Sequence, residues 1–258
     1  MRRIAAPLVC FLVLLLGAPA RGADFTAAQV REILGKASPG HPPDFAGKSL
    51  EKLDLSGFNF AHANLAGASL FGAKLVGADF TDANLAGASL DLAWVIRTNF
   101  TRANLTRASL QGLIVSMGIE TSAAQAPVLA GANLAGARII ARLNWANAAG
   151  ANFAGARMAA DMKNQSMGLM RVDLSTAHLE GANFAGADLG RALLRFAKLA
   201  GANLAGANLL RADLSGADLT GADLTRAIVE DADFGNANLV GAHGLDKMHG
   251  TPLNLVMP

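Results

Sequence analysis

The chain repeats a five-residue pattern of apolar and polar positions over most of its length. A large apolar residue recurs every five positions, as in GANLAGANLLRADLSGADLTGADLT at 201–225. Ala usually stands two positions before this central residue, Asn or Asp stands one before, and Gly often follows two after. A period of five fits neither an α-helix, with about 3.6 residues per turn, nor a plain strand, with about two. The pattern therefore predicts a chain that turns a corner every five residues.

The inner and outer faces of this coil follow from the alternation. Successive residues of an extended chain point to opposite faces, so Ala and the central residue share the inner face while Asn or Asp points outward. The following Gly permits a turn with positive φ. Phe60, Phe80 and Phe100 are spaced by 20 residues, which indicates four fives per coil with the rings stacked. Coils stacked about 4.8 Å apart give a rod on the order of 40 Å long.

The segment ANLAGANLLRADLSGADLTGADL resembles the pentapeptide repeat family, whose signature is A(D/N)LXX. The resemblance covers residues 48–244 and depends on many tandem matches rather than one. It implies an all-β fold, a right-handed quadrilateral β-helix. Counted over the fives, this pentapeptide-repeat solenoid would have about nine coils.

Both ends of the repeat are expected to carry caps, because exposed coil ends invite aggregation. Residues 21–47 form the N-terminal cap helix and linker, with Thr26 and Gln29 as a capping box and Gly35 ending the helix. Residues 245–258 form the C-terminal tail or cap. The alternative for each segment is a flexible terminus.

The repeat breaks near 116–128 and 159–171, and it slips by one residue between Ile139 and Leu143. Insertions in repeat proteins generally become surface loops, often on a binding face. The alternative is drift that a rigid rod tolerates. The slip implies a bulge or a shortened side.

Candidate partner contacts come from outward positions of the repeat and from its breaks. Lys74, Trp94 and Ile114 should form one outward column, and an exposed Trp beside an exposed Ile would make an adhesive patch. The alternative is that a break folds over the patch. The second tryptophan, Trp145, is a further candidate.

Two other groups are weaker candidates. Arg171, Arg191 and Arg211 should form a ladder that could bind an anionic polymer, although a solvated edge is the default. Met162, Met167 and Met170 lie with Met158 in the second break. Thioethers can bind Cu(I), but they also pack adaptably against protein surfaces.

Composition and charge exclude several classes of function. Of the 258 residues, 52% are hydrophobic but only 5% are aromatic, which fits a narrow core of small and medium side chains. The formal charge of +2 suggests neither a polyanion-binding protein nor an acidic DNA mimic. No hydrolase, metalloprotease, P-loop or dinucleotide motif is present, and the five histidines are scattered. We therefore expect no enzyme, no cofactor, no metal site and no nucleic-acid partner.

Residues 1–20 have the features of a secretory signal peptide. Arg2 and Arg3 precede an apolar run over 4–16 that is too short to span a bilayer. Removing this segment would remove the single cysteine, Cys10, and would lower the formal charge from +2 to 0. We expect an exported protein, periplasmic or secreted, without stable membrane insertion.

The sequence thus favours an exported, non-catalytic scaffold that binds an unidentified protein partner. One alternative is a topoisomerase-binding DNA mimic of the quinolone-resistance type, which the family resemblance implies but the charge and the signal oppose. Another is a metal-binding or enzymatic role at the Met-rich break. A homodimer formed through a coil end is also implied by the resemblance.

We predict that the exported chain begins at Arg21 or Ala23, because Ala18 and Ala20, or Ala20 and Gly22, suit a signal-peptidase site. Intact-mass measurement of protein from the envelope fraction checks this. A chain that keeps residues 1–20 in that fraction would contradict it.

Overall fold

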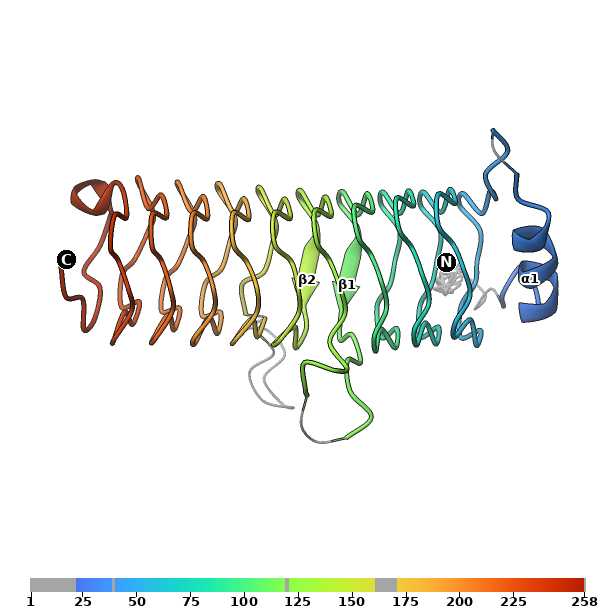
Figure 1. The fold of residues 1–258 in the computed structure, drawn as a ribbon, viewed down its shortest axis with the longest axis horizontal. Helices are drawn as coiled ribbons and strands as arrows, with labels where there is room; N and C mark the ends of the chain where they lie inside the picture. Colours follow the sequence, from blue (N-terminus) through green and yellow to red (C-terminus); the bar gives the residue numbers. More distant parts are fainter. Residues whose placement is uncertain (1–21, 39, 119–120, 161–170, 258) are drawn as a thin grey trace, which may run out of the picture.

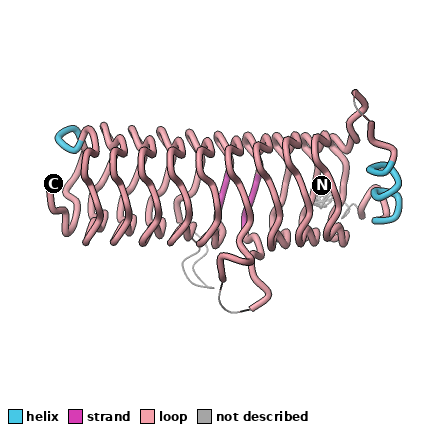
Figure 2. The backbone as a smooth tube through the Cα atoms, in the orientation of Figure 1, coloured by secondary structure: helices cyan, strands magenta, loops and turns pink. Residues whose placement is uncertain are grey.

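The computed structural model describes residues 22–38, 40–118, 121–160 and 171–257. Those residues form an elongated rod with its ends at opposite tips (Figure 1). Helix α1 (Ala27–Gly35), strands β1 (Ser109–Gln111) and β2 (Arg138–Ile140), and the short 3-10 helix η1 (Leu245–Lys247) are the regular elements. Most of the described chain lies outside them (Figure 2). The expected signal peptide lies outside the described residues.

Parallel pairing between residues 20 apart builds the rod. Asn64 pairs with Asn84, and Ser69 pairs with Ser89, as isolated parallel bridges. Strands β1 and β2 pair in the same parallel sense. The bridges fall into four columns, one for each of the four fives that make up a coil. The mostly non-helical β-solenoid expected from the pattern is confirmed.

Most fives end in a turn whose third residue has positive φ. The Ala68 N–H donates to the Leu65 carbonyl over 3.0 Å, which closes the turn. Gly67 within it has φ 65°, as a type II turn requires. The turn therefore recurs at the spacing that the sequence predicts.

The core is a continuous column of central residues and alanines. Phe60 and Phe80 stack with their ring centroids 4.8 Å apart, and Phe80 and Phe100 lie 5.2 Å apart. All three rings are buried, so the predicted phenylalanine stack is confirmed.

Helix α1 closes the N-terminal end of this core. Thr26 and Gln29 form the predicted capping box. Val30 is fully buried, and Phe25 meets Phe45 edge-to-face with ring centroids 5.9 Å apart. The helix ends at Gly35 as expected, and Lys36 caps it with an αR backbone.

The paired region is longer than residues 48–244. Asp44 already bridges Asn64, so pairing begins within the expected linker. At the other end, Asp233 bridges Leu253. The tail continues the coil backbone even though its sequence has left the five-residue pattern.

The breaks change the spacing of the bridges, and three of the four columns continue across them, whereas no bridge joins Ile114 to Arg142 in the fourth. Asn99 bridges Val128, which is 29 residues on, and Val128 bridges Asn147, which is 19 on. Asn147 bridges His178, which is 31 on. The shortened coil agrees with the predicted one-residue slip. The first break is shorter than 116–128, because Val128 belongs to the solenoid.

Replacing Phe80 with Ala should lower the free energy of unfolding by about 3–5 kcal/mol, since it leaves a cavity between two stacked rings. The matched variant Phe196→Ala removes a ring that is 64% exposed and should cost less than about 1 kcal/mol. Chemical denaturation of both variants measures the difference. Equal losses would contradict a core carried by the stacked column.

Candidate interaction surface

Four outward columns of bridged residues divide the surface of the rod, and two of them differ most in composition. The column that we call the asparagine face contains Asp44, Asn64, Asn84, Asn104, Asn133, Asn152, Asn183, Asn203, Asp223 and His243. The column that we call the Trp94 face contains Asp54, Lys74, Trp94 and Ile114 before the first break, and Arg142, Asp173, Leu193, Asp213, Asp233 and Leu253 after it.

The asparagine face stabilises itself. The Asn84 amide donates to the Asn64 side-chain oxygen over 3.1 Å, and Asn104 donates to Asn84 over the same distance. The pattern repeats where Asn203 donates to Asn183. Because these amides hydrogen-bond along the rod, this face offers few free polar groups to a partner.

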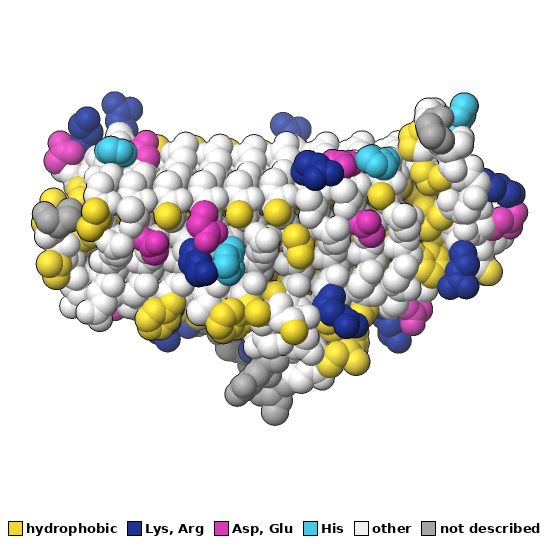
Figure 3. Space-filling view, in the orientation of Figure 1, with side chains coloured by type: hydrophobic (Ala, Val, Ile, Leu, Met, Phe, Trp, Pro, Cys, Tyr) yellow, Lys and Arg dark blue, Asp and Glu magenta, His cyan; other side chains and the backbone are white. Residues whose placement is uncertain are grey.

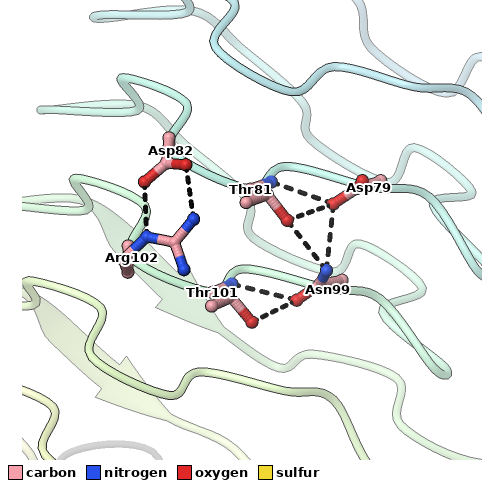
Figure 4. A network of polar contacts seen from close by, with 6 residues as sticks. All are labelled: Asp79, Thr81, Asp82, Asn99, Thr101 and Arg102. Atoms are coloured by element: carbon pink, nitrogen blue, oxygen red, sulfur yellow. Dashed lines mark hydrogen bonds and ion pairs between the residues drawn. The ribbon is translucent and has the colours of Figure 1, made fainter.

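Asn and Asp at the outward position also hold the adjacent turns. The Thr81 N–H and hydroxyl both donate to Asp79 Oδ1, over 3.0 and 2.6 Å, and Asn99 donates to the same oxygen over 3.0 Å (Figure 4). Thr101 donates to Asn99 in the same way one coil later. This residue type at this position therefore has a structural role.

Charged pairs between coils occur at the corners. Arg102 Nε and Nη2 donate to the two carboxylate oxygens of Asp82 over 2.8 and 2.6 Å (Figure 4). The hydrogen bond from Arg102 lowers the pKa of the Asp82 carboxyl. Such an exposed pair contributes little to stability.

The two breaks adjoin the Trp94 face, one at each of its edges. The first break begins directly after Val115, the central residue beside Ile114 on this face, and the Gln125 carbonyl again accepts a coil hydrogen bond from the Arg97 N–H over 2.9 Å. The second break follows Arg157 and Met158 of the neighbouring column and precedes Asp173 of the Trp94 face. The described part of the first break projects from the side of the rod (Figure 1).

Large apolar side chains occupy strained turn positions on both edges of the Trp94 face. Leu92, Trp145 and Phe196 have φ values of 59°, 66° and 54°. Leu92 precedes the Trp94 segment, whereas Trp145 and Phe196 follow the segments of Arg142 and Leu193. They are 48%, 43% and 64% exposed. A left-handed backbone costs a residue with a Cβ about 1–2 kcal/mol.

Two of these side chains cover glycines of the next coil. A Cβ built on Gly216 would lie 2.5 Å from the Phe196 ring, and one on Gly112 would lie 2.8 Å from Leu92 Cδ2. The ring and the isobutyl group therefore lie flat along the edge of the face. In the view of Figure 3, apolar side chains gather along the edge from which the first break projects.

The predicted column of Lys74, Trp94 and Ile114 forms by consecutive bridges. Lys74 is exposed, but Trp94 and Ile114 are half-buried. Ile114 lines a cavity together with Ser116 and Thr121 of the first break. The adhesive patch is therefore partly bordered by that break, and its most exposed apolar groups are the corner residues.

The other predicted candidates do not come together as one site. Arg191 and Arg211 lie in equivalent turns, where Arg211 Nε donates to Asp231 over 3.0 Å, so this end of the ladder is paired. Arg171 lines the same cavity as Ile114. Met162, Met167 and Met170 lie outside the described residues, and Met158 is buried in the core.

Among the residues that the structure describes, no three His, Cys, Asp or Glu side chains gather as a metal site. No helix in that part of the chain is long and apolar enough to span a bilayer. Neither finding adds a chemical function to the surface.

The Pentapeptide repeats family model matches the chain in eight copies, over residues 49–87, 83–116, 169–192 and 192–231. These matches cover more than half of the sequence, and the chain belongs to this family. The first break and the slipped coil lie between the matched stretches.

Solved structures of the same family resemble the chain. HetL, involved in heterocyst differentiation regulation in the cyanobacterium Nostoc sp. Strain PCC 7120, is 30% identical over 80% of this chain and 87% of its own, with a TM-score of 0.41. Full-length QnrB1, a plasmid-mediated fluoroquinolone resistance protein, is 20% identical over 82% and 92%, with a TM-score of 0.40. No curated protein matches the chain.

The sequence contains a signal for Leu92 and Phe196 that the repeat pattern alone does not bring out. Both occupy the second position after a central residue, where Gly is the usual choice. An apolar residue at that position cannot point inward, because the turn directs it away from the core. Trp145 occupies the same position.

Acid should destabilise the rod through its outward aspartates. The Thr220 hydroxyl and N–H donate to Asp218 over 2.6 and 3.1 Å and lower the pKa of this carboxyl below 3.8. A lowered folded-state pKa contributes stability that is present above the unfolded value and lost as pH falls through the folded one. We expect the melting temperature to fall below about pH 4.

Between pH 6 and pH 2, the free energy of unfolding of Asp218→Asn should fall less than that of the unsubstituted protein. The difference should be less than about 1 kcal/mol, because the side chain is one largely exposed group. Asp246→Asn in η1 is the control, since Asp246 accepts no side-chain hydrogen bond among the described residues. Thermal melts from pH 6 to pH 2 give the comparison. A slope unchanged by Asp218→Asn would contradict this role.

Proposed function

We infer that this protein is an exported, non-catalytic scaffold that binds a folded protein partner through the Trp94 face and its two edges. Its coil is the right-handed, four-sided β-helix of about nine turns that the family resemblance implies. The cellular role of the partner is not part of this proposal.

One observation carries the proposal: three large apolar side chains occupy positive-φ turns, where Gly would be free of strain. Of the non-glycine residues in such turns, most are charged or polar, and Leu92, Trp145 and Phe196 are the large apolar exceptions among the described residues. All three flank one face. Local strain combined with exposed apolar groups is typical of a binding site.

The rod also suits a binding role physically. Aromatic side chains are favoured anchors in protein interfaces. Because the solenoid fixes the backbone beneath Trp145 and Phe196, little conformational entropy is lost on association. The asparagine face is a contrasting surface, since its amides already hydrogen-bond to one another.

The alternatives have less support. Topoisomerase binding by DNA mimicry needs a strongly acidic surface, whereas the chain has a formal charge of +2. A supercoiling assay with purified gyrase tests it. Copper binding at the Met-rich break rests on residues outside the described part. A homodimer through a coil end stays a prediction.

Site-specific photo-crosslinking in the host cell tests the proposal. A photoreactive amino acid at Phe196 or Leu92 should give one adduct of defined mass. The control position is Arg107, which is exposed and has φ 57° but lies at the corner beside the asparagine face. No adduct, or the same adduct from Arg107, would count against the Trp94 face.

Purified proteins then test the contact quantitatively. Phe196→Asp should weaken binding of the identified partner at least about tenfold, since a central aromatic anchor contributes about 2 kcal/mol or more. Arg107→Asp should leave the affinity within about twofold. Equal effects of the two substitutions would reject the specific role of the Trp94 edges.

A further inference from the structure

A cavity of about 420 Å³ opens on the Trp94 face between the first break and the shortened coil. Its polar lining includes Ser116, Thr121, Arg142 and Arg171, and its apolar lining includes Leu113, Ile114, Val115, Ile140 and Ala141. The volume is in the range of small-molecule sites in proteins.

The cavity exists because the backbone pairing stops here. Gly112 N–H still donates to the Ile140 carbonyl over 2.7 Å. Beyond this bond, no backbone hydrogen bond between described residues joins Ile114 or Val115 to Arg142. In the preceding coils, the equivalent residues Lys74, Trp94 and Ile114 pair directly. The coils therefore separate on this face.

The separation exposes the interior of the rod. Nearly all core residues of the repeat are at most 1% exposed, but Leu113, Val115, Ile140 and Ala141 are 8%, 5%, 7% and 6% exposed. All four line the cavity. The buried aliphatic side chains are therefore slightly more accessible at this point than along most of the solenoid.

The polar lining is rich in hydrogen-bond donors. Arg142 follows β2, whereas Arg171 follows the second break, so the two arginines reach the cavity from segments that are separate in the sequence. Among the described residues, neither forms a salt bridge with a carboxylate. A guanidinium presents a planar fork of donors that matches the two oxygens of a carboxylate.

We propose that this cavity binds a carboxylate carried on a short apolar group, with the anion at Arg142 and Arg171 and the apolar group against Val115 and Ile140. A free organic acid and the C-terminus of a peptide share this chemistry. Both carry an apolar group that can pack against Val115 and Ile140, which a bare inorganic anion cannot do. The site is independent of the protein-partner proposal, because either one can fail without the other.

The probe is N-acetyl-leucine, and its uncharged amide is the matched ligand control. Saturation-transfer NMR on the purified exported chain should show contact of the leucine methyl protons. We expect the amide to bind at least about tenfold more weakly, since it loses a charge-assisted hydrogen bond. Equal binding of the amide, or no binding of N-acetyl-leucine at 10 mM (roughly the weak limit of specific affinity), would overturn the proposal.

Arg142→Gln combined with Arg171→Gln should weaken N-acetyl-leucine binding at least about tenfold. The control pair, Arg138→Gln with Arg157→Gln, lies on the neighbouring face in adjacent coils and outside the cavity lining. Circular dichroism and thermal melts establish that both variants fold. Undiminished binding by the folded Arg142 and Arg171 variant, or equal loss in the control, would overturn the site.

Two further ligands distinguish a peptide C-terminus, a free organic acid and a bare inorganic anion as the natural ligand. A short peptide ending in leucine should bind at least tenfold more tightly than N-acetyl-leucine if the natural ligand is a peptide C-terminus, and about equally if it is a free acid. Either result supports the carboxylate site. Inorganic phosphate that displaces N-acetyl-leucine at equal or lower concentration would overturn it in favour of an unselective anion site.

Discussion

Backbone pairing between residues one coil apart is the constraint on which this structure depends. Most outward residues bridge their equivalents in the coils before and after, as Asn84 bridges Asn64 and Asn104. The pairing fixes the inner side chains in register, so equivalent central residues stack on one another, as the rings of Phe60, Phe80 and Phe100 do. The inner positions are therefore limited to a few residue types, and the outer positions vary more, although outward Asn and Asp still hold the adjacent turns.

Function in such a molecule is confined to outward positions, corners and breaks. The asparagine face uses its outward positions for internal hydrogen bonds. The Trp94 face instead has apolar residues at its edges, and both breaks adjoin it. The cavity beside the first break lies where the pairing is interrupted, and the interruption is on this same face.

The sequence predicted what repeats, because each five carries the same information. The phenylalanine stack, the Thr26 capping box and the shortened coil were all visible as patterns. The cavity was not, because it depends on how two breaks and a slip combine in space. Val128 looked like part of a break, yet its backbone pairs as regularly as its neighbours, since bridging does not require the outward residue to be polar. The tail pairs through Leu253 for the same reason.

The interrupted pairing between Ile114 and Arg142 has a consequence for how the rod holds together along its axis. In a solenoid each repeat contacts only its neighbours, so stability adds up interface by interface. One interface here lacks the hydrogen bonds of its fourth side. Within the described part of the chain, this interface near the middle of the rod therefore has fewer backbone hydrogen bonds between coils than its neighbours. We expect bending of the rod to concentrate there.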